Sequence, residues 1–292
     1  AEGLDQTRGW FYTLLVLSTA LFDRPAFKNV IVNGLILAED GRKMSKSLKN
    51  YPDPNDVINT HGADALRAYL INSPLVRAEP MRFSESGVRD VVRSVVLPLW
   101  NAYSFFATYA AVDKWTPPAN STPVSERSLM DKWIISMAQS LVRDVNVEME
   151  AYRLYNVIPR VLGFIDHLTN WYIRRSRDRF WGTGEGGADL AGLDTLFTVL
   201  VTLTQVAAPF LPMITEEIWS GLCDGDDTMP SSVHLSTWPA AATYCDEPSL
   251  VAAMDRLRDV ASTGLRLRED QGLRVRLPLA SVTIAGRDAS TL

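Results

Sequence analysis

Apolar residues recur every three or four positions along most of the chain, which is the spacing of helices that bury one face. In the first such stretch Trp10, Leu14 and Leu21 fall on one face. The pattern predicts helices over residues 7–21, 63–72, 84–106, 125–149, 151–181, 188–208, 212–222 and 250–268. Because proline lacks an N–H and crowds the preceding turn, we expect kinks at Pro98 and Pro159. Short connections between the later helices indicate an antiparallel bundle.

Strand patterns are confined to short segments. The β-branched residues 30–32 end at Asn33-Gly34 and predict a buried strand, and residues 279–284 are a second candidate. A helix, a strand and then a polar loop is the order found at the end of a parallel α/β unit, where ligands bind outside the carboxyl ends of the strands. Asp53 before Pro54 predicts the start of a short helix.

Two further segments have the composition of connections. Prolines and small polar residues fill 116–123, which predicts a stiff, solvated linker. Glycines dominate residues 182–187, which predicts a loop between two of the bundle helices.

Composition is that of an ordinary globular protein, with 47% hydrophobic and 22% charged residues among 292. Uncharged apolar runs stay short of about 18 residues and no leader pattern is seen, so we expect no membrane span and a cytoplasmic location. Cys223 and Cys245 are expected to be free thiols, since two cysteines cannot by themselves supply the four ligands of a structural zinc site.

Charge is unevenly distributed. The formal net charge of −5 is unfavourable for binding nucleic acid as a whole. Two groups of arginines nevertheless stand out, one near the middle and one near the end of the chain: Arg174, Arg175, Arg177 and Arg179, and Arg266, Arg268, Arg274 and Arg276. A local basic surface is therefore still available for an anionic partner.

The sequence KMSKS at residues 43–47 is the strongest chemical signal. Lys43 and Lys46 place two ammonium groups close to the hydroxyls of Ser45 and Ser47. Lysine is a flexible point charge with three donors, and such groups suit a polyphosphate that gains charge in a transition state. A solvated basic turn is the alternative for so short a motif.

Four segments together resemble the class I aminoacyl-tRNA synthetases, and in particular their isoleucyl members. They are the signature loop at 34–47 (GLILAEDGRKMSKS), the segment typical of the isoleucyl branch at 5–12 (DQTRGWFY), the helix after the loop at 61–67 (HGADALR) and part of the anticodon-binding bundle at 170–177 (NWYIRRSR). The resemblance covers nearly the whole chain and is weakest at its end.

The resemblance implies a mostly α fold in three parts. Residues 1–50 would be a remnant of the Rossmann-like α/β catalytic core that carries the lysine loop. Residues 51–116 would contact the tRNA stem and connect to the bundle. Residues 125–292 would form the class Ia anticodon-binding helical bundle and the start of a C-terminal region.

The resemblance also implies the chemistry. In the intact enzyme isoleucine reacts with ATP, in the presence of Mg²⁺, to give an adenylate, and the acyl group then passes to tRNA-Ile. Lys43 and Lys46, with the two serines between and after them, would contact the phosphates. The adenylate would be lined by residues near the start of the chain, Glu2, Gly3, Asp5 and Gln6. From spacing alone, the two acids among these are equally ordinary at a helix start.

The arginines at 174–179 would contact phosphates of the anticodon stem by the same resemblance, and Trp171, Tyr172 or Trp181 could stack on an exposed base. A solvated helix face, with the arginines paired to Asp178, is the alternative. The aromatic residues at 10–12 are expected to be core rather than ligand contacts.

A second signature of the family, His-Ile-Gly-His, is not found, because His61, His167 and His234 are each isolated. The editing domain and a zinc site are not found either. We therefore expect a C-terminal fragment that is a monomer and is inactive alone. A noncatalytic tRNA-binding module, or a fragment of a valyl or leucyl relative, remains the alternative.

Overall fold

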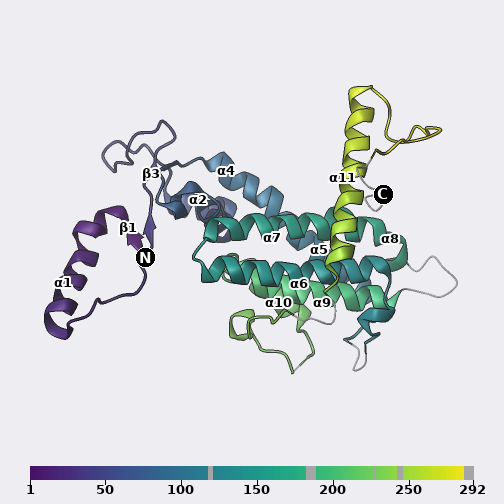
Figure 1. The fold of residues 1–292 in the computed structure, drawn as a ribbon, viewed down its shortest axis with the longest axis horizontal. Helices are drawn as coiled ribbons and strands as arrows, with labels where there is room; N and C mark the ends of the chain where they lie inside the picture. Colours follow the sequence, from purple (N-terminus) through teal and green to yellow (C-terminus); the bar gives the residue numbers. More distant parts are fainter. Residues whose placement is uncertain (118–120, 182–188, 227, 242–245, 286–292) are drawn as a thin grey trace.

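The computed structural model describes residues 1–117, 121–181, 189–226, 228–241 and 246–285. Part of the predicted linker, the glycine-rich loop at 182–187 and Cys245 lie outside the described residues. Figure 1 shows a helical bundle at one end of the long axis and a small α/β part at the other, with one long helix projecting from the bundle.

Most of the described chain is helical, as the periodicity predicts. The α-helices are α1 (Trp10–Phe22), α2 (Pro54–His61), α3 (Ala63–Ile71), α4 (Glu85–Val91), α5 (Leu97–Val112), α6 (Leu129–Glu150), α7 (Val157–Asp166), α8 (Arg174–Phe180), α9 (Leu190–Ala207), α10 (Pro212–Leu222) and α11 (Pro248–Asp270). Short 3-10 turns are η1 (Leu4–Arg8), η2 (Pro74–Arg77), η4 (Val124–Glu126), η5 (Leu154–Asn156) and η7 (Val233–Leu235), and π-helical turns are η3 (Val92–Val96) and η6 (His167–Ile173).

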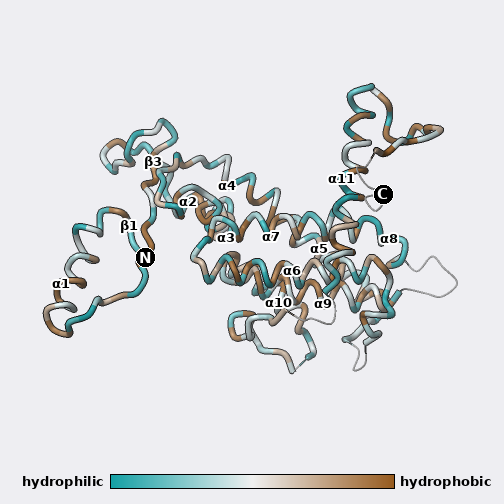
Figure 2. Tube along the Cα trace, viewed as in Figure 1, coloured by the Kyte–Doolittle hydropathy of each residue, from teal (hydrophilic) through white to brown (hydrophobic). Residues whose placement is uncertain are grey.

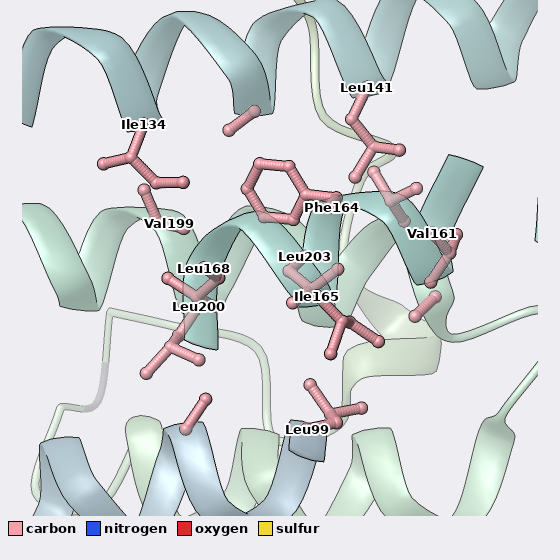
Figure 3. Packing of buried hydrophobic residues seen from close by; sticks show 14 of the residues in the cluster. Leu99, Ile134, Leu141, Val161, Phe164, Ile165, Leu168, Val199, Leu200 and Leu203 are labelled. Carbon is pink, nitrogen blue, oxygen red and sulfur yellow. The ribbon is translucent and has the colours of Figure 1, made fainter. Parts of the chain in front are cut away.

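The core lies between α5, α6, α7 and α9, whose apolar faces meet as predicted for a bundle. Figure 3 shows Leu99, Ile134, Phe164 and Leu203 pointing into the same space from these four helices. Leu99 and Leu203 are 0% exposed. Each such side chain stabilises the fold by roughly 1.5–3 kcal/mol relative to the exposed state, so the bundle is the main source of stability.

Irregular turns in the long helices do not fall at the prolines. Pro98 lies in the first turn of α5, and the widened turn is η3 before it. In a regular α-helix, residue 98 would donate its N–H to the carbonyl of Ser94, but proline has no N–H. Because Ser94 lies within η3, the wider π-helical turn accommodates this missing hydrogen bond. The kink expected at Pro159 is wrong: this proline is in the first turn of α7, where N–H groups have no partner within the helix. The irregular turn there is η6, and the helix predicted from 151 begins at 157.

The α/β part consists of two pairs of very short parallel strands. β1 (Glu2–Gly3) pairs with β2 (Val32–Asn33), with α1 as the crossover, and β3 (Ile36–Leu37) pairs with β4 (Met81–Arg82). The prediction of a buried strand at 30–32 is wrong, since the strand begins at Val32 and Val30 is 46% exposed. The strand expected at 279–284 is also wrong, because those residues have no regular structure.

Helix α1 carries the predicted apolar face, but most of this face is uncovered among the described residues. Trp10 is 55% and Tyr12 61% exposed, and α1 has no buried residue. Figure 2 shows hydrophobic residues on this helix although it stands apart from the bundle. Phe11 is half-buried and meets the ring of Phe27 edge-on. The expectation that the aromatic residues at 10–12 are core is therefore wrong for the chain as described.

A clip of charged residues fastens the connecting region to the bundle. Asp64 in α3 accepts hydrogen bonds from the backbone N–H groups of Met213 and Ile214, so it caps the first turn of α10. Arg67, one turn later, donates to the carbonyls of Pro209 and Phe210 at the corner before α10. A carboxylate at a helix N-terminus satisfies free N–H groups and the helix dipole. This Asp64–Arg67 clip therefore sets how the α/β part sits on the bundle.

Two helical stretches, Glu85–Val112 and Leu190–Ala207, are long and apolar enough to cross a membrane by length and composition alone. In the second stretch, 61% of the window is buried inside the protein, as in a core helix of a globular fold. One or two such stretches are weak evidence for a span, so the expectation of no membrane segment stays a prediction.

We predict that the helices differ in the rate of amide hydrogen exchange. Amides of α6 and α9 will exchange most slowly, because both helices are packed on the core, whereas those of α1 will exchange fastest among the described helices of comparable length. Mass-spectrometric exchange at peptide resolution measures this. Protection of α1 equal to that of α6 would contradict the uncovered face.

Candidate functional site

The lysine loop follows directly from β3. Backbone bonds from Ala38 to Arg42 and from Gly41 to Ala38 close a tight turn. Gly41 has φ +83°, and a side chain there would also press on the guanidinium of Arg82 at 3.1 Å. The sequence Asp40-Gly41 thus supplies the reversal, and the chain returns to pair at Lys43 with Leu37.

Asn50 braces the loop from its far end. Its amide oxygen accepts from the backbone N–H of Ser45 at 2.9 Å, and its amide nitrogen donates to the carbonyl of Lys43 at 3.1 Å. Ser45 and Ser47 share a hydrogen bond of 2.8 Å between their hydroxyls. Met44 lines a small cavity of about 110 Å³ together with residues that include Tyr51 and Phe83. The KMSKS segment is therefore a folded loop rather than an extended chain.

The ammonium groups of this loop are not paired with carboxylates in the described part of the chain. Lys43 and Lys46 are exposed, and neither forms an ion pair with any residue in the described part of the chain. Arg42 differs, since it pairs with Asp40 at 2.6 Å. Two unpaired cations on a braced loop are chemically suited to hold phosphate oxygens.

The four candidates at the chain start form a local group of their own. Glu2 and Gly3 form β1, and the backbone N–H of Glu2 donates to Ile31 at 3.1 Å. Gln6 accepts from the N–H of Trp10 at the start of α1 and donates to Asp5. Within the described residues none of the four bonds to the lysine loop. Their role in lining an adenylate stays a prediction.

The four clustered arginines have different surroundings because they lie on different faces of α8. Arg174 and Arg177 are exposed and have no ion pair with any described residue, Asp178 included. Arg175 lies over the ring of Trp171 at 4.4 Å. Arg179 turns inward, where Asp131 and other groups take up its donors, so the structure gives this arginine a different use from the phosphate contact expected of it.

Asp131 is the centre of a buried polar cluster. It is 0% exposed, and Arg179 binds it through two nitrogens at 2.7 and 2.9 Å. The hydroxyl of Tyr172 donates to it at 2.6 Å and that of Ser128 at 2.7 Å. Arg179 also donates to Asp189, which caps α9. The cluster therefore ties α6, η6, α8 and α9 together.

The electrostatics of this cluster follow from burial and pairing. Burial alone would raise the pKa of Asp131, but the hydrogen bonds from Arg179 and Tyr172 outweigh it and lower the pKa below its ordinary value. Burial likewise opposes the charged guanidinium, yet the bonds to Asp131 raise the pKa of Arg179. Burial, reinforced by the neighbouring carboxylate of Asp131, raises the pKa of Tyr172, which stays a neutral donor. The ion pair is thus complete at neutral pH.

Sequence reasoning missed two residues that organise these sites. Asn50 was visible only as a polar residue shortly after the lysine motif. Asp131 had a clearer signal, because it is a carboxylate in the helix that continues into the apolar run 133–135, three residues after Ser128, which is the spacing of a reciprocal cap. Among the described residues there is no group of three or more His, Cys, Asp and Glu side chains placed to hold a metal.

Comparison with known proteins agrees with this geometry. Residues 1–82 match the family described as tRNA synthetases class I (I, L, M and V), and residues 131–284 match the anticodon-binding domain of tRNA ligase. The chain belongs to this family of class I tRNA ligases with an anticodon-binding domain.

Similar curated proteins include isoleucine–tRNA ligases from several bacteria. The chain is 48% identical to that of Bdellovibrio bacteriovorus and 49% to that of Protochlamydia amoebophila, over 100% of its own length and 28% of theirs. It is 48% identical to that of Leifsonia xyli, of which it covers 25%. The chain thus spans about a quarter of the length of these relatives.

A solved structure shares the fold. The ternary complex of Agrobacterium radiobacter K84 LeuRS with tRNA and LeuAMS matches with a TM-score of 0.64 over 84% of this chain and 29% of that chain, at 21% identity. The predicted succession of an α/β catalytic remnant and a helical bundle is confirmed.

We predict that Asp131→Asn destabilises the protein by about 3–5 kcal/mol, because it leaves the guanidinium of Arg179 without its counter-charge. Denaturant unfolding at pH 7 measures the loss. Asp178→Asn is the matched control, since this exposed aspartate lies in α8 next to Arg179 and has no ion pair within the described chain, and its effect should stay within about 0.5 kcal/mol.

The same variant gives a pH test. Because the folded-state pKa of Asp131 is lowered, its stabilisation is complete above the unfolded value near 4 and is lost as the pH falls through the folded value. The parent protein will lose stability over this acidic window, and Asp131→Asn will lose less. Parallel pH profiles of the two would contradict a stabilising carboxylate.

Proposed function

We propose that the chain acts within an isoleucine–tRNA ligase, in which the bundle binds the anticodon arm of tRNA-Ile and the lysine loop binds the phosphates of ATP. The observation that carries this is the match of residues 131–284 to the anticodon-binding domain of tRNA ligase. It is supported by the names of the similar curated proteins and by two basic sites without ion pairs in the described chain, the lysine loop in the α/β part and the outer arginines of α8 in the bundle (Figure 1).

The proposed reaction needs charge neutralisation more than it needs an acid or base. The carboxylate of isoleucine attacks the α-phosphorus of ATP, the bond to the β-phosphate oxygen breaks and pyrophosphate leaves. Lys46, assisted by Lys43, holds the oxygens on which charge grows, and the Asn50 brace keeps the loop in shape for this. Mg²⁺ comes with the nucleotide, since it keeps most of its ligands from phosphates and water.

The α/β part fits the role of one portion of a larger nucleotide-binding fold. Parallel sheets in proteins are covered on both faces, whereas the apolar face of α1 is uncovered in the described chain. In the proposed enzyme the remaining α/β layers pack on this face. Glu2, Gly3, Asp5 and Gln6 lie at the edge of the same unit and would line the adenylate.

We predict that Lys46→Ala slows adenylate formation roughly 10²–10³-fold in a ligase that contains this chain together with its other domains. The reason is the loss of one ammonium group from the charge that develops on pyrophosphate. Isoleucine-dependent exchange of pyrophosphate into ATP measures the rate.

Lys49→Asn is the matched control for this experiment. It removes a lysine three positions away, and Asn tolerates the left-handed backbone that Lys49 adopts at φ +47°. We expect a much smaller effect on exchange. An unchanged rate in Lys46→Ala, or equal losses in both variants, would contradict the role given to the loop.

We predict that Arg174→Ala together with Arg177→Ala weakens binding of an anticodon-arm hairpin. Because two phosphate contacts are lost, the slope of log K against log salt will flatten by roughly two. Filter binding or fluorescence anisotropy at several salt concentrations measures both quantities. The control is Arg8→Ala with Arg24→Ala, which removes the same charge from exposed residues of the α/β part. An equal flattening in both double variants would reject the assignment to α8.

A further inference from the structure

The two faces of helix α8 differ: the inner face contacts the rest of the protein, and the outer face is exposed. Arg175 and Arg179, four residues apart, are occupied within the protein by Trp171 and by Asp131. Between them Ser176 is buried, and so is Phe180. Bonds on this inner face fix both the rotation of the helix and its position on α6 and α9. The outer face is therefore presented rigidly, and its direction does not depend on a partner.

The outer face is a stripe made of Arg174, Arg177 and Trp181, which follow one another at intervals of three and four residues. Both arginines are exposed and unpaired within the described chain, and Trp181 is 49% exposed. Asp178 shares this face and is exposed as well, yet no ion pair forms between it and either arginine. Pairing with Asp178, the alternative that would make the stripe an ordinary solvated face, is absent among the described residues.

Trp181 is held in place by its polar edge. The indole N–H donates to the hydroxyl of Tyr109 at 2.7 Å. Tyr109 packs on Phe105, with ring centroids 4.7 Å apart, and Phe105 meets the buried Phe180 at 5.3 Å. Because the N–H is already satisfied, the group that Trp181 offers to a partner is the face of its ring. An exposed indole that is anchored in this way loses little rotamer freedom on binding.

The structure separates Trp181 from the other two aromatic candidates. Tyr172 is 0% exposed and bonded to Asp131. The ring of Trp171 is covered by Arg175 at 4.4 Å and Arg258 at 5.7 Å, and its N–H is directed at the sulfur of Met254. Tyr172 is therefore closed off by burial, and the ring of Trp171 already contacts two guanidinium groups. Trp181 alone of the three combines exposure, anchoring and adjacent unpaired cations.

We infer that Trp181 is a stacking platform for one unpaired RNA base, and that Arg177 and Arg174 bind the phosphates that lead from that base into the adjoining stem. This rests on the proposed function and names the part of the RNA that the stripe recognises. Base–aromatic stacking tolerates any base, so the stripe recognises a looped strand next to a duplex rather than a sequence. The duplex alone can satisfy the arginines but not the indole.

The test compares two probes on three variants of Trp181 and Asp178. The probes are an anticodon-arm hairpin and a blunt duplex with the same stem, measured by fluorescence anisotropy at low salt. Trp181→Ala should weaken the hairpin roughly tenfold or more and leave the duplex unchanged. Trp181→Phe, which keeps an aromatic ring but loses the bond to Tyr109, should retain most of the hairpin affinity. Thermal melts of each variant verify that the bundle is folded.

Asp178→Asn provides a test in the opposite direction. Removing a carboxylate beside the two arginines should strengthen binding of both probes a few-fold at low salt, and the gain should vanish at high salt. Hairpin binding that is unchanged in Trp181→Ala, or weakened equally with the duplex, would overturn the inference while leaving the proposed function intact. Failure of the parent protein to bind the hairpin at all would overturn the proposed function and this inference with it.

Discussion

The buried ion pair between Asp131 and Arg179 is the interaction on which the rest of the bundle's outer surface depends. Asp131 lies in α6, and its carboxylate accepts bonds from the N-cap of α6, from η6 and from α8, so none of these elements can rotate without breaking one of them. Removing either residue would leave an unpaired charge inside the protein at a high cost in free energy. The two residues therefore stabilise the bundle only as a pair. One consequence is the division of the arginines: with Arg179 held inside, the helix turns Arg174 and Arg177 toward solvent.

Much of the secondary structure could be predicted because its signals are local. Asp53 caps α2 with Pro54 in the first turn, and α10 begins at Pro212 and ends at Leu222, both as expected from the sequence. The lysine loop could also be predicted as a candidate phosphate site, since its two lysines and two serines lie within five consecutive residues. The helix starts at 129 and 157, later than expected, reflect caps and 3-10 turns that periodicity does not encode.

What could not be predicted depends on neighbours remote in sequence. The periodicity of α1 identifies an apolar face but not whether anything covers it, and Trp10 is exposed as a result. The four arginines look alike in the sequence, and only the positions of Asp131 and Trp171 separate them. Neither proline simply kinks its helix. Pro98 follows the π-turn η3, and Pro159 lies in the first turn of α7. In each case the deciding partner is in another element.

The Asp64–Arg67 clip has a consequence for the spacing of the two proposed binding sites. It joins α3 to the start of α10 through a charged cap and two carbonyl contacts, so the region that follows the lysine loop is fastened to the bundle that carries the stripe. In the proposed enzyme, the nucleotide at the lysine loop and the RNA at the stripe would therefore be held apart by the protein itself. The clip would then serve as a spacer between the two ligands.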